Sequence, residues 1–143
     1  MPRPASPLLV AAGLLGLTGV ACGAFGAHAV AGWVEAAYPD PALAARRLEN
    51  WRTAASYHLW HALACGLCGV LAVHIPSKFL NAAGGCFAAG VAVFSGSLYA
   101  LVLSRQAWLG AVTPLGGVLF MAGWGLLTAA AWRAGRPRRE PRV

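Results

Sequence analysis

The stretch LLVAAGLLGLTGVACGAFGAHAV, residues 8–30, decides the fold class, because it contains no Asp, Glu, Lys or Arg. About 20 such residues in a helix, at 1.5 Å each, cross the roughly 30 Å hydrocarbon core of a bilayer. The whole chain agrees, since 59% of its 143 residues are hydrophobic and 10% are charged. A soluble domain carries about a quarter charged residues. The sequence therefore predicts a membrane protein.

A cleaved leader peptide is the alternative interpretation of this stretch. Arg3 precedes it, and Gly19-Val20-Ala21-Cys22 resembles a lipoprotein cleavage box. However, a Leu-like residue is expected three positions before the cysteine, where this chain has Gly19. The apolar run also continues to Val34, which is too long for the apolar core of a leader. We therefore expect the stretch to be retained as the first span.

Three more apolar segments follow, and none alternates in polarity as the strand of a membrane barrel does. We predict one all-α domain over residues 1–143, a four-transmembrane-helix bundle with helices at about 8–34, 51–75, 79–103 and 113–132. Ser77 and Asp40 are expected to cap helices, as is the Thr113 hydroxyl ahead of Pro114. The mixed polarity of residues 41–50 predicts a short interfacial helix between the first two spans.

The placement of Lys and Arg predicts the orientation, because these residues concentrate on the cytoplasmic side. Arg3, Lys78 and the basic tail 133–143 would all lie on one side, although Arg46 and Arg47 fall on the other. Both termini are therefore predicted to be cytoplasmic. We interpret the tail as an anchor at anionic lipid headgroups rather than a nucleic-acid site.

Polar residues within the spans gather toward the opposite, extracytoplasmic side. Ionisable residues inside a membrane are candidates for function. The predicted polar cluster comprises His28, Glu49, Arg52, His58, His61, Ser95, Ser97, Tyr99, Arg105 and Thr113.

The histidines of this cluster suggest a metal or haem site. His58 and His61 lie three residues apart, a spacing that brings side chains to neighbouring positions on a helix. Imidazole suits copper or zinc, and an axial histidine suits haem. His28 could complete a three-histidine site with the other two. The alternative is that each histidine only hydrogen-bonds a neighbouring helix, and this is the commoner role.

The remaining motifs are interpreted as structural. Gly16, Gly19, Gly23 and Gly26 form a stripe that would let the first helix approach a neighbour closely. Cys65 and Cys68 resemble a redox motif, but on a helix in lipid they are expected to pack. Ser95 and Ser97 point to different sides of a helix and are expected to bond carbonyls one turn earlier. Tyr99 and four tryptophans are expected at the membrane interfaces: Trp33, Trp51, Trp108 and Trp132.

Four ordered motifs resemble one known family, that of the domain of unknown function 423, which includes transmembrane protein 256 of animals. They are GAFGAH (23–28), WRTA with YH and HAL (51–63), FSGSLY (94–99), and LGAVTPLGG with GW (109–124). The resemblance spans roughly residues 8 to 132. It implies a small four-helix protein of bacterial plasma membranes, or of mitochondria in animals. It implies no activity, substrate or cofactor.

Three functions remain open. The first is a non-enzymatic accessory or assembly protein that binds lipid, a membrane partner or a second copy of itself. The second is a copper or haem protein that uses His28, His58 and His61. The third is an intramembrane enzyme or small-molecule carrier built on the same cluster.

Overall fold

A computed structural model describes residues 6–135, and within that range it is helical apart from short turns, with no strand. Four helical spans are long and apolar enough to cross a membrane: Pro7–Ala37, Pro41–His74, Lys78–Ser104 and Ala107–Ala134. The predicted four-span helical fold is confirmed.

Three of the spans are composite. The first consists of α1 (Pro7–Phe25), the π-helical η1 (Gly26–Val30) and α2 (Ala31–Ala37). The second is α3 alone (Pro41–His74). The third consists of α4 (Lys78–Gly90), the π-helical η2 (Val91–Ser95) and α5 (Gly96–Ser104). The fourth consists of the 3₁₀-helical η3 (Ala107–Ala111) and α6 (Thr113–Ala134).

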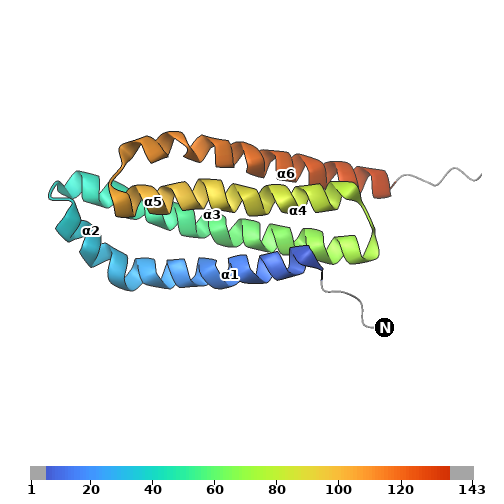
Figure 1. The fold of residues 1–143 in the computed structure, drawn as a ribbon, viewed down its shortest axis with the longest axis horizontal. Helices are drawn as coiled ribbons and strands as arrows, with labels where there is room; N and C mark the ends of the chain where they lie inside the picture. The colour runs from blue at the N-terminus through green and yellow to red at the C-terminus, as the bar shows by residue number, and fades with distance from the viewer. Residues whose placement is uncertain (1–5, 136–143) are drawn as a thin grey trace, which may run out of the picture.

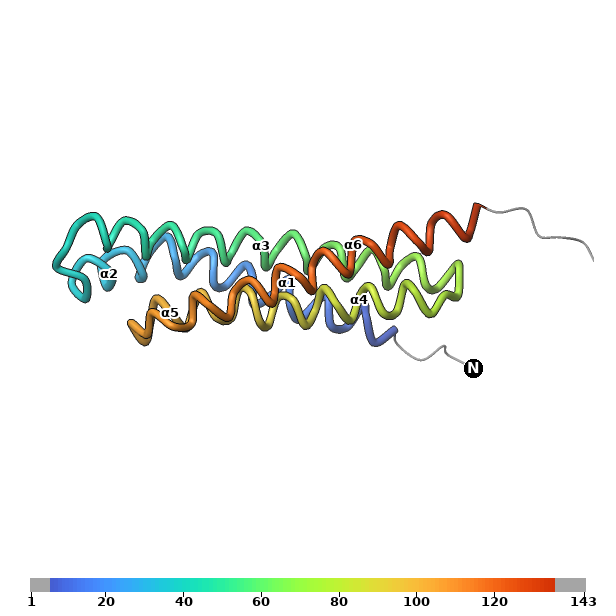
Figure 2. The backbone as a smooth tube through the Cα atoms, turned by 90° about the horizontal axis from the view of Figure 1, so that it is seen from above, coloured from blue at the N-terminus to red at the C-terminus, as the bar shows by residue number. Residues whose placement is uncertain are grey.

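The spans run up and down, and each packs mainly on the span that follows it in the chain. α1 packs on α3, α3 on α4 and α5, and α4 on α6. Figure 1 shows α1 and α6 at opposite edges, with α3, α4 and α5 between them. Figure 2 shows the same spans from above, running side by side along the long axis of the molecule. We call the end formed by residues 35–52 and 104–113 the polar end.

Two of the three predicted helix caps are confirmed. The Asp40 carboxylate accepts a hydrogen bond from the Ala42 amide at 3.0 Å, and the Ser77 hydroxyl accepts one from the Phe79 amide at 3.3 Å. The predicted Thr113 cap is wrong. Thr113 is already helical, and its hydroxyl bonds Ser97 of the neighbouring span at 2.9 Å instead.

The predicted separate interfacial helix is also wrong, because residues 41–50 are the first turns of a continuous α3. These residues are mostly Ala, Leu, Arg and Glu, which favour helix, and no Gly or Pro interrupts the chain until Gly66. At 1.5 Å per residue α3 is about 51 Å long, against a core of about 30 Å. The outer turns of α3 therefore extend beyond the hydrocarbon core.

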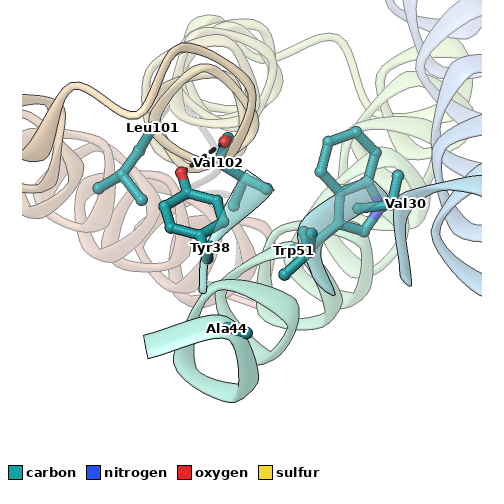
Figure 3. Packing of buried hydrophobic residues seen from close by; sticks show 7 residues of the cluster. Val30, Tyr38, Ala44, Trp51, Leu101 and Val102 are labelled. Atoms are coloured by element: carbon teal, nitrogen blue, oxygen red, sulfur yellow. Dashed lines mark hydrogen bonds between the residues drawn. The ribbon is translucent and has the colours of Figure 1, made fainter. Parts of the chain in front are cut away.

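A core at the polar end ties three spans together (Figure 3). The Tyr38 hydroxyl donates to the Val102 carbonyl at 2.8 Å, which joins the end of the first span to α5. The π-helical η1 ends at Val30, and Val34 follows one turn later; both valines are almost fully buried. The members of this core are Val30, Val34, Tyr38, Ala44, Trp51, Leu101 and Val102.

A second core lies in the other half of the bundle and contains both cysteines of the 65–68 motif. Cys65 and Cys68 are completely buried in it, against Phe87 of α4 and Phe120 of α6.

Of the basic tail, Arg133 lies over the Phe79 ring at 4.5 Å. The other tail arginines (Arg136, Arg138, Arg139 and Arg142) lie outside the described residues, as does Arg3.

Candidate functional site

His28 does not join the other two histidines of the predicted cluster. It lies in the π-helical η1 and its side chain is exposed, whereas His58 and His61 are buried in α3. Within residues 6–135, no three His, Cys, Asp or Glu side chains lie close enough to hold a metal ion.

His58 faces α1. Its Nε2 lies 3.3 Å from the Thr18 hydroxyl, and a Cβ built on Gly19 would come within 3.3 Å of its ring. The side chain is only 6% exposed, and in the described part of the chain its Nδ1 has no hydrogen-bond partner. His58 therefore keeps one buried nitrogen uncommitted.

His61 faces α6 and is fully committed. A carbonyl can only accept, so Nδ1–H donates to the Tyr57 carbonyl at 2.8 Å. Nε2 is then the acceptor for the Trp124 indole N–H at 3.4 Å. The ring also stacks on Phe120, with 3.5 Å between ring centroids and 9° between planes. A metal at His61 would have to displace the Trp124 hydrogen bond.

The separation of the two α3 histidines has a geometric cause. Three residues turn an α-helix by about 300°, which leaves the side chains about 60° apart. His58 lies on the side of α3 that packs on α1, and His61 lies on the side that faces α6. The three-residue spacing therefore does not give the two histidines a common partner.

The serines of the third span fasten it to two different helices. The Ser95 hydroxyl donates to the Ala54 carbonyl of α3 at 2.8 Å, so the predicted local bond is wrong for Ser95. The Ser97 hydroxyl bonds the Phe94 carbonyl at 3.0 Å, as predicted, and also meets the Thr113 hydroxyl at 2.9 Å. Both serines are buried, and they point to different sides.

Trp51 belongs to the core at the polar end, and the half-buried Tyr99 packs against it, so Trp51 does not face lipid as the predicted interfacial tryptophan would. Trp51 is 4% exposed, and its indole N–H donates to the Cys22 carbonyl at 2.9 Å. Its ring lies 4.6 Å from that of Tyr99, between centroids. Trp33 and Trp108 keep exposed side chains.

Sequence reasoning missed two residues that join spans, Thr18 and Tyr38. Thr18 contacts His58 and Tyr38 bonds the Val102 carbonyl, and the partners in each contact lie far apart in the chain.

The charged members of the predicted cluster lie at the surface of the polar end. Glu49 and Arg52 form an exposed ion pair at 3.9 Å. Arg105 ends α5 with a left-handed backbone (φ 61°), and its guanidinium donates to the Ala37 carbonyl at 3.3 Å. Arg105 thus joins the ends of two spans, the Glu49–Arg52 pair stays within α3, and none of these contacts involves His58 or His61.

The predicted glycine stripe divides into two pairs. A Cβ on Gly19 would come within 2.8 Å of Leu59, and one on Gly26 within 2.5 Å of the Trp51 indole. A Cβ on Gly16 or Gly23 would meet nothing within 4 Å. Gly19 and Gly26 therefore let the first span touch α3, whereas Gly16 and Gly23 leave space beside α3.

The two largest grooves among the described residues lie between neighbouring spans. One lies between α3 and α6, has a volume of about 640 Å³, and is lined mainly by aromatic side chains. The lining residues include Tyr57, Trp60, His61, Phe94, Phe120 and Trp124. The other runs between α1 and α3 in two hollows of about 470 Å³ and 560 Å³, which adjoin at Leu59.

Comparison with known proteins gives consistent matches. The family model described as "Protein of unknown function (DUF423)" matches residues 22–117. The UPF0382 membrane protein SAB0533 of Staphylococcus aureus is 38% identical over 125 residues, which cover 87% of this chain and 94% of that relative. The UPF0382 membrane protein YwdK of Bacillus subtilis is 39% identical over 116 residues, which cover 80% and 87%.

No solved structure matches the chain. The relatives are bacterial membrane proteins that span nearly the same length as this chain. The family model covers more than half of the chain and includes the buried histidines, the Ser95–Ser97 pair and Thr113–Pro114 at the start of α6. The chain therefore belongs to the DUF423 family of membrane proteins of unknown function.

Proposed function

We propose that the protein is a non-enzymatic membrane protein that binds lipid. The polar side chains that could serve catalysis are used to hold helices together: Ser95 on α3, Ser97 on Thr113, and His61 on Trp124. A hydroxyl that donates to a backbone carbonyl, and an imidazole with both nitrogens engaged, are poor candidates for a nucleophile and its base.

The observation that carries the proposal is the pair of grooves between neighbouring spans. A close-packed membrane helix pair fills its own interface with side chains. Here Gly16 and Gly23 leave a groove between α1 and α3, and a second groove lies between α3 and α6. In a bilayer these spaces are filled by acyl chains, and a groove of fixed shape holds them longer than a smooth helix face.

The test is whether lipid stays with the purified protein. We expect full-length protein in mild detergent to retain a small, fixed number of lipids in native mass spectrometry. Removing them by extensive detergent washing should lower the thermal midpoint, and adding lipid back should restore it, because a ligand that binds only the folded state stabilises it. Protein without retained lipid, and with an unchanged midpoint on lipid addition, would contradict the proposal.

A second candidate, a copper- or haem-binding protein, is favoured by the uncommitted Nδ1 of His58. A metal or haem at His58 would need further ligands, because no three His, Cys, Asp or Glu side chains come together within residues 6–135. The test is absorbance and elemental analysis of the purified chain. A Soret band or stoichiometric copper, lost in His58→Ala but kept in the exposed His28→Ala, would support a centre at His58. Colourless, metal-free protein removes this candidate.

A further inference from the structure

We infer that the groove between α1 and α3 is a site for an anionic phospholipid, with the phosphate at Arg52 and an acyl chain along the helices. The inference rests on the proposed lipid-binding function, and it adds the place of the site and the charge of the headgroup.

The groove consists of two hollows that share one wall residue, Leu59. The hollow nearer the polar end is lined by Gly23, Gly26, Ala27, Ala31, Trp51, Arg52, Ala55, Ser56 and Leu59. We call the hollow farther from the polar end the deeper hollow. It is lined by Leu9, Ala12, Gly16, Val20, Leu59, Ala62, Leu63, Gly66, Leu67 and Val70.

Small residues open the groove on both sides of one tight contact. Leu59 lies against Gly19, where a Cβ would come within 2.8 Å of it. Above and below that contact, Gly23 and Gly16 leave their positions empty. From Arg52 to Leu63, 11 residues further along α3, the groove extends about 17 Å at 1.5 Å each, which is about half of the roughly 30 Å core and so the depth of one leaflet. A phospholipid with its phosphate at Arg52 would therefore place an acyl chain along this helix pair within one leaflet.

The polarity of the lining matches an amphiphile with one charged end. Arg52 and Ser56, one helical turn apart, line the hollow at the polar end, whereas every side chain that lines the deeper hollow is apolar. The Arg52 side chain is 68% exposed, and its partner Glu49, at 3.9 Å, is equally exposed. Such surface pairs are weak, so the guanidinium remains able to bind a phosphate with two hydrogen bonds.

The first experiment measures headgroup selectivity. Full-length protein in detergent is titrated with phosphatidylglycerol, and separately with phosphatidylcholine of the same acyl chains, and lipid adducts are quantified by native mass spectrometry. We expect phosphatidylglycerol to bind more tightly. Arg52→Gln should weaken it roughly tenfold, the loss of one charge-assisted contact. The matched control is Arg46→Gln, because Arg46 is also exposed on the outer turns of α3 but lines neither hollow.

The second experiment fills the groove. Gly23→Leu and Gly16→Leu place side chains in the two hollows and should each remove the tight phosphatidylglycerol adduct. Gly13→Leu is the control, since Gly13 is also on α1 with open space around its Cβ but lines neither hollow. Because all three positions are open, the variants are expected to fold, and circular dichroism melting checks this.

The outcomes separate the site from the general function. Equal binding of the two lipids, or equal losses in Arg46→Gln and Arg52→Gln, would overturn the site while retained lipid leaves the proposed function standing. Wild-type protein that binds no lipid overturns both. A dimer that Gly23→Leu dissociates, with the lipid adducts unchanged, would assign the groove to a second copy of the chain and overturn the inference.

Discussion

Trp51 of the second span binds the first span at the polar end. Its indole N–H donates to the Cys22 carbonyl at 2.9 Å, and its ring packs on Tyr99. Gly26 makes room for the indole, because a Cβ there would come within 2.5 Å of the ring nitrogen. The carbonyl, the ring and the missing Cβ hold Trp51 in one position.

At this scale we predict that Gly26→Ala destabilises the fold and Gly23→Ala does not. The added methyl at residue 26 would push into a buried ring that its hydrogen bond holds in place, at a cost of about 1–3 kcal/mol. At residue 23 the methyl meets nothing, and Ala is the better helix former. The measurement is the unfolding free energy of both variants in detergent. Equal stability of the two variants would contradict the described contact between Gly26 and Trp51.

Among the elements, η2 joins α4 to α5 and brings the third span against two neighbours. Its Ser95 hydroxyl bonds α3, and α6 packs closely on the same segment. Gly116 of α6 sits against the backbone of Phe94, so the two helices touch main chain to main chain. Backbone contact of this kind requires a glycine.

We therefore predict opposite results for two adjacent glycines of α6. Gly116→Ala would place a methyl into the Phe94 backbone, which cannot rotate away, so folded protein should be lost or strongly destabilised, by about 3 kcal/mol or more. Gly117→Ala adds the same methyl where nothing lies within 4 Å and should be tolerated. The yield of monodisperse protein and its thermal midpoint measure both. A tolerated Gly116→Ala would show that α6 packs differently from the description above.

The elements also show which features the sequence could predict. Hydropathy gave the four spans, and local chemistry gave the caps at Asp40 and Ser77, since both are short-range properties. The partners of His58 and His61 depend on which helix covers each side of α3, and no local pattern contains that information. The π-helical segments likewise break the regular 100° spacing from which faces were assigned.

For the whole molecule, the strongest asymmetry is between its two ends. The polar end holds α2, the outer turns of α3 and the left-handed Arg105, whereas the opposite end holds the start of α1, the turn at Ser77 and the end of α6. A bilayer around the four spans would place these ends in different aqueous compartments. The Lys and Arg distribution predicts that the polar end is extracytoplasmic.

Cysteine labelling tests this orientation. In a variant whose native cysteines are replaced, Gln106→Cys at the polar end should react with a membrane-impermeant maleimide in intact cells, because Gln106 is exposed. Gly135→Cys, at the other end, should react only after the cells are opened. Labelling with the reverse pattern would place the polar end in the cytoplasm.

The packing of each span on the next one in the chain also bears on how the protein is made. Because α1 packs on α3, α3 on α4, and α4 on α6, every main interface joins segments that leave the ribosome one after the other. Contacts between neighbouring segments need little loop closure and form quickly. Assembly can thus proceed helix by helix during synthesis, and the first two spans can pair before the fourth exists.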